Sequence, residues 1–266
     1  MASKTQWAWI GLLTILVLVA GTGAAYAYPS FFSGTGGVQT PSPEVVPTGQ
    51  FDLAADYWKT KSRDTDVTTW PIRLVAGVSE RAELGIAYTR VTTSGGEDAN
   101  VSGAGGKYLI TQEAEKGVDL GVGANYLSWS DGGDLDMTQL YAVVGKNLTP
   151  KTEAYAEPSK TKAYGYIGAM YTRFSPSGGA SESFTEPFVG LVLSGEGGAL
   201  ALEWQRAKFG DDITSAVLRY QFNPMIAGEV GVTNNLGGES EVGTSHRVFA
   251  GLSYRFGTPK GEGRGW

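Results

Sequence analysis

Apolar and polar residues alternate along the chain in segments of about ten residues each, beginning near residue 50. In residues 118–128, for example, Leu120, Val122 and Tyr126 fall on one face of an extended strand, and Asp119 and Asn125 fall on the other. A period of two indicates a β-strand with one apolar face. The pattern predicts about twelve strands, near residues 50–59, 68–79, 82–91, 104–112, 118–128, 136–147, 163–174, 183–194, 199–209, 212–222, 225–233 and 247–256.

This alternation also fits a soluble sandwich or a lipocalin-like barrel, whose apolar row faces inward. The connections favour a membrane barrel instead. Tight turns are expected at Ser79–Arg81, Asn147–Pro150, Gly195–Gly198 and Asn223–Pro224, and the connections between them are mostly longer polar loops. Only Gly210–Asp211 is short where a long loop is expected. Short turns at one end and long loops at the other are typical of outer-membrane barrels.

Aromatic residues lie where the two membrane interfaces would be. Strands running in one direction finish with Tyr57, Tyr88 and Tyr126, and strands running back finish with Tyr220 and Phe222 or with Tyr254 and Phe256. Amphipathic rings favour the headgroup level of a bilayer. We therefore predict an all-β fold, a transmembrane antiparallel up-and-down β-barrel of about twelve strands with lipid outside.

The N-terminus has the features of a cleaved signal peptide. Lys4 precedes an apolar run at Ile10–Ala20, and Ala25-Tyr26-Ala27 supplies a cleavage site. An uncleaved anchor is the alternative, although the run is shorter than the ~20 residues that span a bilayer. The predicted organisation is a signal peptide at 1–27, an extended Pro- and Gly-rich lead-in at 28–49, a barrel at 50–256 and a tail at 257–266, in the bacterial outer membrane.

Two stretches resemble known outer-membrane families. The strand His246–Phe256 resembles the last strand of outer-membrane barrels, which ends in Phe and is recognised by the barrel-assembly machinery; here the tail follows that Phe. Ser33-Gly34-Thr35-Gly36, with Thr40-Pro41, Pro47, Gly49 and Phe51, resembles the opening of YjbH-like outer-membrane proteins. That resemblance covers about a tenth of the chain and implies a role in exopolysaccharide production and export.

Charge and composition exclude several chemistries. The chain has 266 residues, a formal net charge of −6 and no cysteine. The acidic balance argues against a nucleic-acid partner, and the absence of cysteine removes disulfides, thiolate catalysis and Cys-based zinc sites. The 39 glycines are unusual for a helical domain.

Catalytic and metal-binding signals are weak. The one histidine, His246, lies beside Ser245, and a hydrolase centred on it would also need an orienting partner and an oxyanion donor. Gly103–Lys107 lacks the spacing of a phosphate loop. The carboxylates of Asp131–Asp136 could hold Ca²⁺, but such a loop is more often simply hydrated. We expect no enzyme activity, no cofactor and no metal site.

The polar rows of the strands are the better functional candidate. If they face inward, they place charges of both signs in the lumen, where the charges either pair into a brace or line a narrow pore. The candidate lumen-lining residues are Asp52, Asp56, Arg73, Glu83, Lys107, Asp119, Glu203, Arg219, Glu229, Arg247 and Arg255.

We expect a small-solute pore or a structural envelope protein. The alternatives are an accessory component of polysaccharide secretion and, less favoured, a hydrolase centred on His246. Expected partners are outer-membrane lipid and lipopolysaccharide, the barrel-assembly machinery during biogenesis, and small solutes or polysaccharide. Divalent ions would bridge the acidic long loops to lipopolysaccharide.

A gel experiment tests the membrane-barrel prediction. Folded outer-membrane barrels resist unfolding by detergent, so the purified protein should migrate anomalously on a denaturing gel until it is boiled. Identical migration of boiled and unboiled samples would contradict the prediction.

Overall fold

The computed structural model describes residues 28–30, 35–36, 39–61, 66–94, 98–130, 135–149, 161–195, 197–206, 212–236 and 246–258. The predicted signal peptide and nearly all of the predicted tail lie outside these residues. The barrel strands are β3 (Gln50–Lys61), β4 (Asp66–Ser79), β5 (Ala82–Thr93), β6 (Ala99–Thr111), β7 (Asp119–Ser130), β8 (Leu135–Asn147), β9 (Lys162–Pro176), β10 (Glu182–Gly195), β11 (Gly198–Gln205), β12 (Asp212–Gln221), β13 (Ile226–Leu236) and β14 (His246–Gly257).

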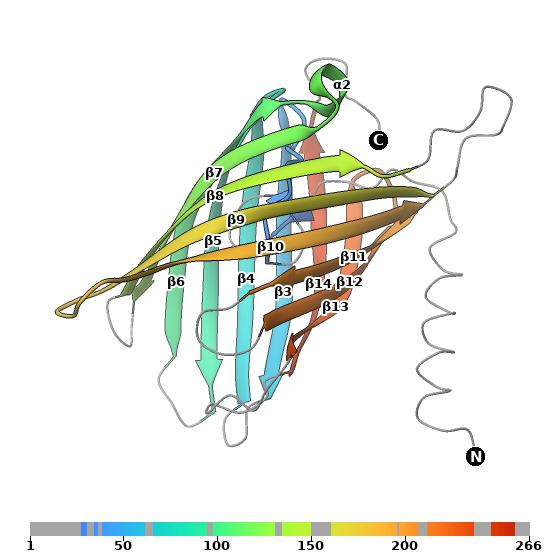
Figure 1. Cartoon of the computed structure of the whole chain (residues 1–266). Helices are drawn as coiled ribbons and strands as arrows, with labels where there is room; N and C mark the ends of the chain where they lie inside the picture. The colour runs from blue at the N-terminus through green and yellow to red at the C-terminus, as the bar shows by residue number, and fades with distance from the viewer. Residues whose placement is uncertain are drawn as a thin grey trace, which may run out of the picture.

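These twelve strands form one closed antiparallel barrel in which each strand pairs with its neighbours in sequence (Figure 1). The first strand, β3, pairs with the last, β14, which closes the sheet. Phe51 lies opposite Phe256 across this seam, and their rings stack with centroids 5.2 Å apart. The predicted fold class and all twelve predicted strands are confirmed, with ends that differ by a few residues.

The connections divide into two ends. At one end, called the turn end here, β4–β5, β10–β11 and β12–β13 are joined by short turns, and the four-residue helix α2 (Glu113–Lys116) joins β6 to β7. The tight turn predicted at Asn147–Pro150 is wrong, because β8 ends at Asn147 and β9 begins only at Lys162. Residues 150–160 of this connection, including Pro158, lie outside the described residues. The opposite end is called the loop end.

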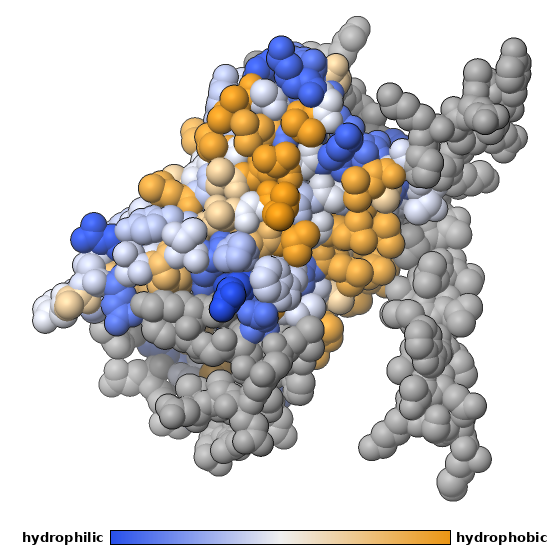
Figure 2. Space-filling view, viewed as in Figure 1, coloured by the Kyte–Doolittle hydropathy of each residue, from blue (hydrophilic) through white to orange (hydrophobic). Residues whose placement is uncertain are grey.

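The apolar row of every strand faces outward. Leu84 and Leu252 are 58% and 59% exposed, although a soluble protein would bury such side chains. On the face shown in Figure 2, apolar residues gather over the middle of the barrel wall and hydrophilic residues lie toward its ends. The aromatic residues expected at the interfaces are exposed as well: Tyr57, Tyr88, Tyr126, Tyr220, Phe222, Tyr254 and Phe256. Exposed apolar surface of this extent fits a lipid environment.

Among the described residues, no helix has the length and hydropathy that a membrane-crossing helix needs.

The inner faces of β8 to β10 carry many aromatic and apolar side chains. Their largest buried cluster consists of Tyr141, Val143, Tyr164, Tyr166, Met170 and Phe188. A second cluster lies on the inner faces of β3, β11, β12 and β14, where the Trp58 and Phe249 rings stack with centroids 4.2 Å apart. Part of the barrel interior is therefore packed like a protein core rather than lined by polar groups alone.

Several inward aromatic rings lie over a glycine directly opposite on the neighbouring strand. The pairs are Gly123–Tyr141, Gly168–Phe188, Gly190–Tyr166 and Gly231–Phe249. A β-carbon at Gly168 would lie 2.3 Å from the Phe188 ring and 2.5 Å from the Ala142 carbonyl oxygen. The missing side chain thus allows each ring to lie against the barrel wall instead of crossing the lumen.

This packing predicts that Gly168→Ala lowers the free energy of unfolding by about 1–3 kcal/mol, because the methyl group overpacks the contact with Phe188 and the Ala142 carbonyl. Gly121→Ala is the matched control, since a β-carbon there has ordinary contacts of 3.4 Å and longer. Urea unfolding of the reconstituted barrel, followed by tryptophan fluorescence, measures both variants. Equal stabilities would contradict the prediction.

Candidate functional site

Four ion pairs join neighbouring strands across the inner face of the described barrel: Asp52–Arg255, Asp56–Arg73, Glu83–Lys107 and Glu229–Arg219. Lys107 lies directly opposite Glu83 in register, with its Nζ 3.2 Å from Oε1. The Nε of Arg219 lies 3.1 Å from Oε2 of Glu229, again directly opposite. An unpaired buried charge costs several kcal/mol, so pairing across adjacent strands is what makes a charged interior tolerable.

Three more inward carboxylates are held by uncharged donors. The Tyr164 hydroxyl donates to Oδ2 of Asp119 at 2.8 Å. The side-chain amide of Gln205 donates to Oε2 of Glu186 at 3.0 Å. Glu203 accepts a hydrogen bond of 2.7 Å from the Tyr166 hydroxyl. These three contacts bring no positive charge to the inner face.

The structure places the candidate residues from the sequence as follows. Buried or nearly buried on the inner face are Asp52, Asp56, Arg73, Glu83, Lys107, Asp119, Glu203, Arg219, Glu229 and Arg255. Arg247 also belongs to the inward row of β14, opposite Thr60 and Thr233, but it lies near the loop end and is exposed. Sequence reasoning missed Glu186, which shares the inward row of β10 with Phe188 and Gly190. The alternation carries that signal, but Phe188 interrupts the polar row.

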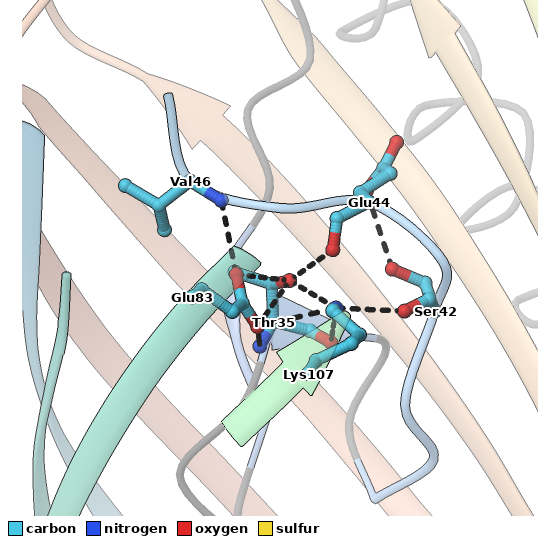
Figure 3. A network of polar contacts seen from close by, with 6 residues as sticks. All are labelled: Thr35, Ser42, Glu44, Val46, Glu83 and Lys107. Atoms are coloured by element: carbon cyan, nitrogen blue, oxygen red, sulfur yellow. Dashed lines mark hydrogen bonds and ion pairs between the residues drawn. The ribbon is translucent and has the colours of Figure 1, made fainter. Parts of the chain in front are cut away.

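The lead-in also enters the barrel, which sequence reasoning did not predict. Its described residues include a two-stranded sheet of β1 (Tyr28–Pro29) and β2 (Thr35–Gly36), followed by residues 39–49. Thr35 is fully buried, and its backbone N–H donates to Oε1 of Glu83 at 2.7 Å. Lys107 donates to the carbonyl oxygen of Thr35 at 2.9 Å, so the lead-in binds the Glu83–Lys107 pair directly (Figure 3).

Two further lead-in groups complete this network. The Val46 N–H donates to Oε2 of Glu83 at 2.9 Å, and Lys107 also donates to the Ser42 carbonyl oxygen at 2.7 Å (Figure 3). Glu83 and Lys107 therefore exchange hydrogen bonds with each other and with the backbone of the lead-in.

A second contact lies on β11. The backbone N–H of Gln39 donates to Oε2 of Glu203 at 3.0 Å, and the Thr40 hydroxyl donates to Oε1 of the same carboxylate. Nearby, Arg219 donates to the Gly36 carbonyl oxygen at 3.3 Å. The lead-in thus supplies donors to the carboxylates and acceptors to the cations.

Glycines on the inner wall allow the lead-in backbone to approach closely. A β-carbon at Gly77 would lie 2.2 Å from the Pro47 carbonyl oxygen, and one at Gly145 would lie 2.6 Å from Cγ of Pro43. The Gly49 N–H donates to the Gly77 carbonyl oxygen at 2.9 Å, which fixes the lead-in at the turn end just before β3 begins.

Glu44 lies in the lead-in beside this network. Burial raises the pKa of its carboxyl above the ordinary value, and the nearby charges of Lys107 and Arg219 oppose that rise. Asp119 adds to it through repulsion. The ionised form of Glu44 is therefore unfavourable in the docked lead-in.

The described residues add no geometry for the two other candidate sites, the histidine site and the acidic loop. His246 begins β14, but its side chain and Ser245 lie outside the described residues, as do residues 131–134 of the acidic loop. Within the described ranges, no group of three or more metal-ligating side chains comes together.

Comparison with solved structures identifies the architecture. Similar chains include an outer membrane channel from Pseudomonas putida F1, at TM-score 0.55 and 14% identity over 83% of this chain and 100% of that one. The NanC porin gives 0.53 and 10% over 76% and 98%, and the KdgM porin gives 0.51 and 12% over 76% and 99%. A KdgM structure in complex with disordered oligogalacturonate gives 0.50. The chain has the fold of bacterial outer-membrane channels and porins.

No family model matches the chain, and no curated protein matches it. The likeness to YjbH-like proteins stays a prediction from the residues.

The burial of Glu44 predicts a pH-dependent stability that Glu44→Gln removes. A carboxyl whose pKa is raised in the folded state stabilises that state only while it is protonated, so this contribution is lost as the pH rises above about 4.5, the ordinary value. Glu44→Gln should therefore raise the unfolding temperature relative to the parent chain at pH 8, and the difference should shrink at pH 4. A gel-based heating series at both pH values measures this. A constant difference, or none at pH 8, would contradict the prediction.

Proposed function

We propose that the chain is an outer-membrane channel for small cationic or uncharged polar solutes. The observation that carries this proposal is the division between the two faces of the closed barrel. The outer face exposes large apolar side chains, whereas the inner face carries buried ionisable groups from β3 to β7 and from β10 to β14. A charged lumen within an apolar shell is the arrangement by which a barrel carries polar solutes across lipid.

The balance of inner charges supports a preference for cations. Among the described strand residues of the inward rows, there are eight carboxylates and six cationic groups, counting the exposed Lys162, Glu182 and Arg247 at the strand ends, an excess of two negative charges. The printed hydrogen bonds of Asp119 and Glu203 come from uncharged donors, which add no positive charge. Because the wall has a low dielectric constant, it focuses the field of these charges along the axis and raises the local concentration of cations.

The same balance argues against a polyanionic solute. Oligogalacturonate, the ligand of the similar KdgM structure, carries a carboxylate on every sugar unit, and the acidic inner face of this chain would repel it. Polysaccharide secretion, contacts with lipopolysaccharide and recognition by the assembly machinery are separate proposals that rest on the sequence.

Planar-bilayer recordings of the purified protein test the proposal. Discrete conductance steps are expected, and under a KCl gradient the reversal potential should have the sign of a cation-selective pore. Glu186→Gln removes one negative charge from the inner face and should shift the reversal potential toward zero.

Asp136→Asn is the matched control, since Asp136 belongs to the outward row of β8, beside the buried inward Met137. It should leave the reversal potential nearly unchanged. Absence of conductance from a correctly folded barrel would favour the structural envelope protein instead, and anion selectivity would refute the proposed solute class.

A further inference from the structure

The described lead-in residues 35–36 and 39–46 lie in the turn-end part of the barrel interior. The exposed fractions of Thr35, Thr40 and Val46 are 0%, 1% and 0%, and Glu83 and Lys107 on the wall are 1% and 3% exposed. A side chain that borders a water-filled passage exposes part of its surface to that water. The passage is therefore occupied at this level.

The segment also reaches from one wall to the other. Val46 bonds to Glu83 on β5, and Thr40 bonds to Glu203 on β11. Following the barrel order from β11 through β14 and β3 to β5, these strands are six positions apart in a ring of twelve, so they lie on opposite walls. A chain segment bonded to both walls crosses the lumen.

We propose that residues 39–46, together with Thr35 and Gly36, form an internal gate, which closes the channel by occupying the groups that a solute would otherwise contact. This inference rests on the proposed channel function. Glu83 receives the N–H groups of Thr35 and Val46, and Glu203 receives an N–H and a hydroxyl. The gate presents donors to both carboxylates, as a cationic or hydroxylated solute would.

The hydrogen bonds between the gate and the wall can be exchanged for hydrogen bonds to water or solute. Hydrogen bonds to Glu83, Lys107 and Glu203 can be replaced by water or by the solute at small net cost, since bonds made in the protein replace bonds to water. The C-terminal end of the gate is fixed at the rim by the Gly49–Gly77 hydrogen bond and by the Thr48–Gly77 bridge. Release toward the turn end would leave the segment tethered there and would expose both carboxylates to the passage.

Deletion of residues 35–46 tests the gate in planar bilayers, because it leaves every barrel strand intact. The deletion variant should have an open fraction about tenfold or more above that of the parent chain, since removing a closed state that is favoured by little more than 1.4 kcal/mol has that effect. Conduction by both chains with the same open fraction would overturn the gate and leave the channel function standing. Absence of conductance from both folded chains would overturn the channel function, and the gate with it.

A thiol-protection experiment tests the gate even if the deletion variant does not fold. The chain has no cysteine, so Ser42→Cys places a single thiol in the gate, and Ser177→Cys places the control thiol in the exposed turn between β9 and β10. The thiol at position 42 should react with a water-soluble methanethiosulfonate reagent roughly tenfold or more slowly than the control, because it is reached only when the gate opens. Adding Thr35→Ala and Thr40→Ala should speed its reaction. Equal rates at positions 42 and 177 would overturn the gate.

Discussion

The hydrogen-bonded seam between β3 and β14 is the constraint on which the rest of the structure depends. A sheet with open edges would expose unpaired N–H and C=O groups to hydrocarbon, and closure removes both edges at once. Closure also forces every second side chain of every strand into one enclosed interior. The seam itself shows the consequence: Leu53 and Tyr254 face outward as a pair, and Asp52 and Arg255 meet as an ion pair on the inside.

An enclosed interior must satisfy every polar group that points into it. The strands meet most of this demand in three ways: with ion pairs between neighbours, with uncharged donors such as Tyr164, and by filling part of the interior with aromatic rings over glycines in place of polar groups. The lead-in adds a fourth, because its backbone satisfies Glu83, Lys107 and Glu203 where the wall alone does not. The groups that stabilise the closed form are thus the groups that an open form would offer to a solute.

The strands were predictable from sequence because each one separates lipid from the barrel interior. This contrast produces an alternation of apolar and polar residues with a period of two. The alternation is least clear in β9 and β10, where Tyr166 and Phe188 make the inner face apolar as well. The course of the lead-in was not predictable. Its Pro- and Gly-rich sequence has no period, and its partners on the wall lie from 28 to 183 residues away. Contacts over such separations depend on which walls closure brings together, and the local pattern does not carry that information.

The position of the lead-in has a consequence for how the molecule assembles. The segment is made before any strand, yet its hydrogen-bonding partners are distributed from Glu83 to Arg219, so its final contacts form only after β12 is in place. Either the segment lies beside the incomplete sheet, which then closes around it, or it inserts into the closed barrel through the opening at the turn end. In both orders the segment inserts late, so a chain in which it is bound inside the barrel has already formed most of the barrel strands.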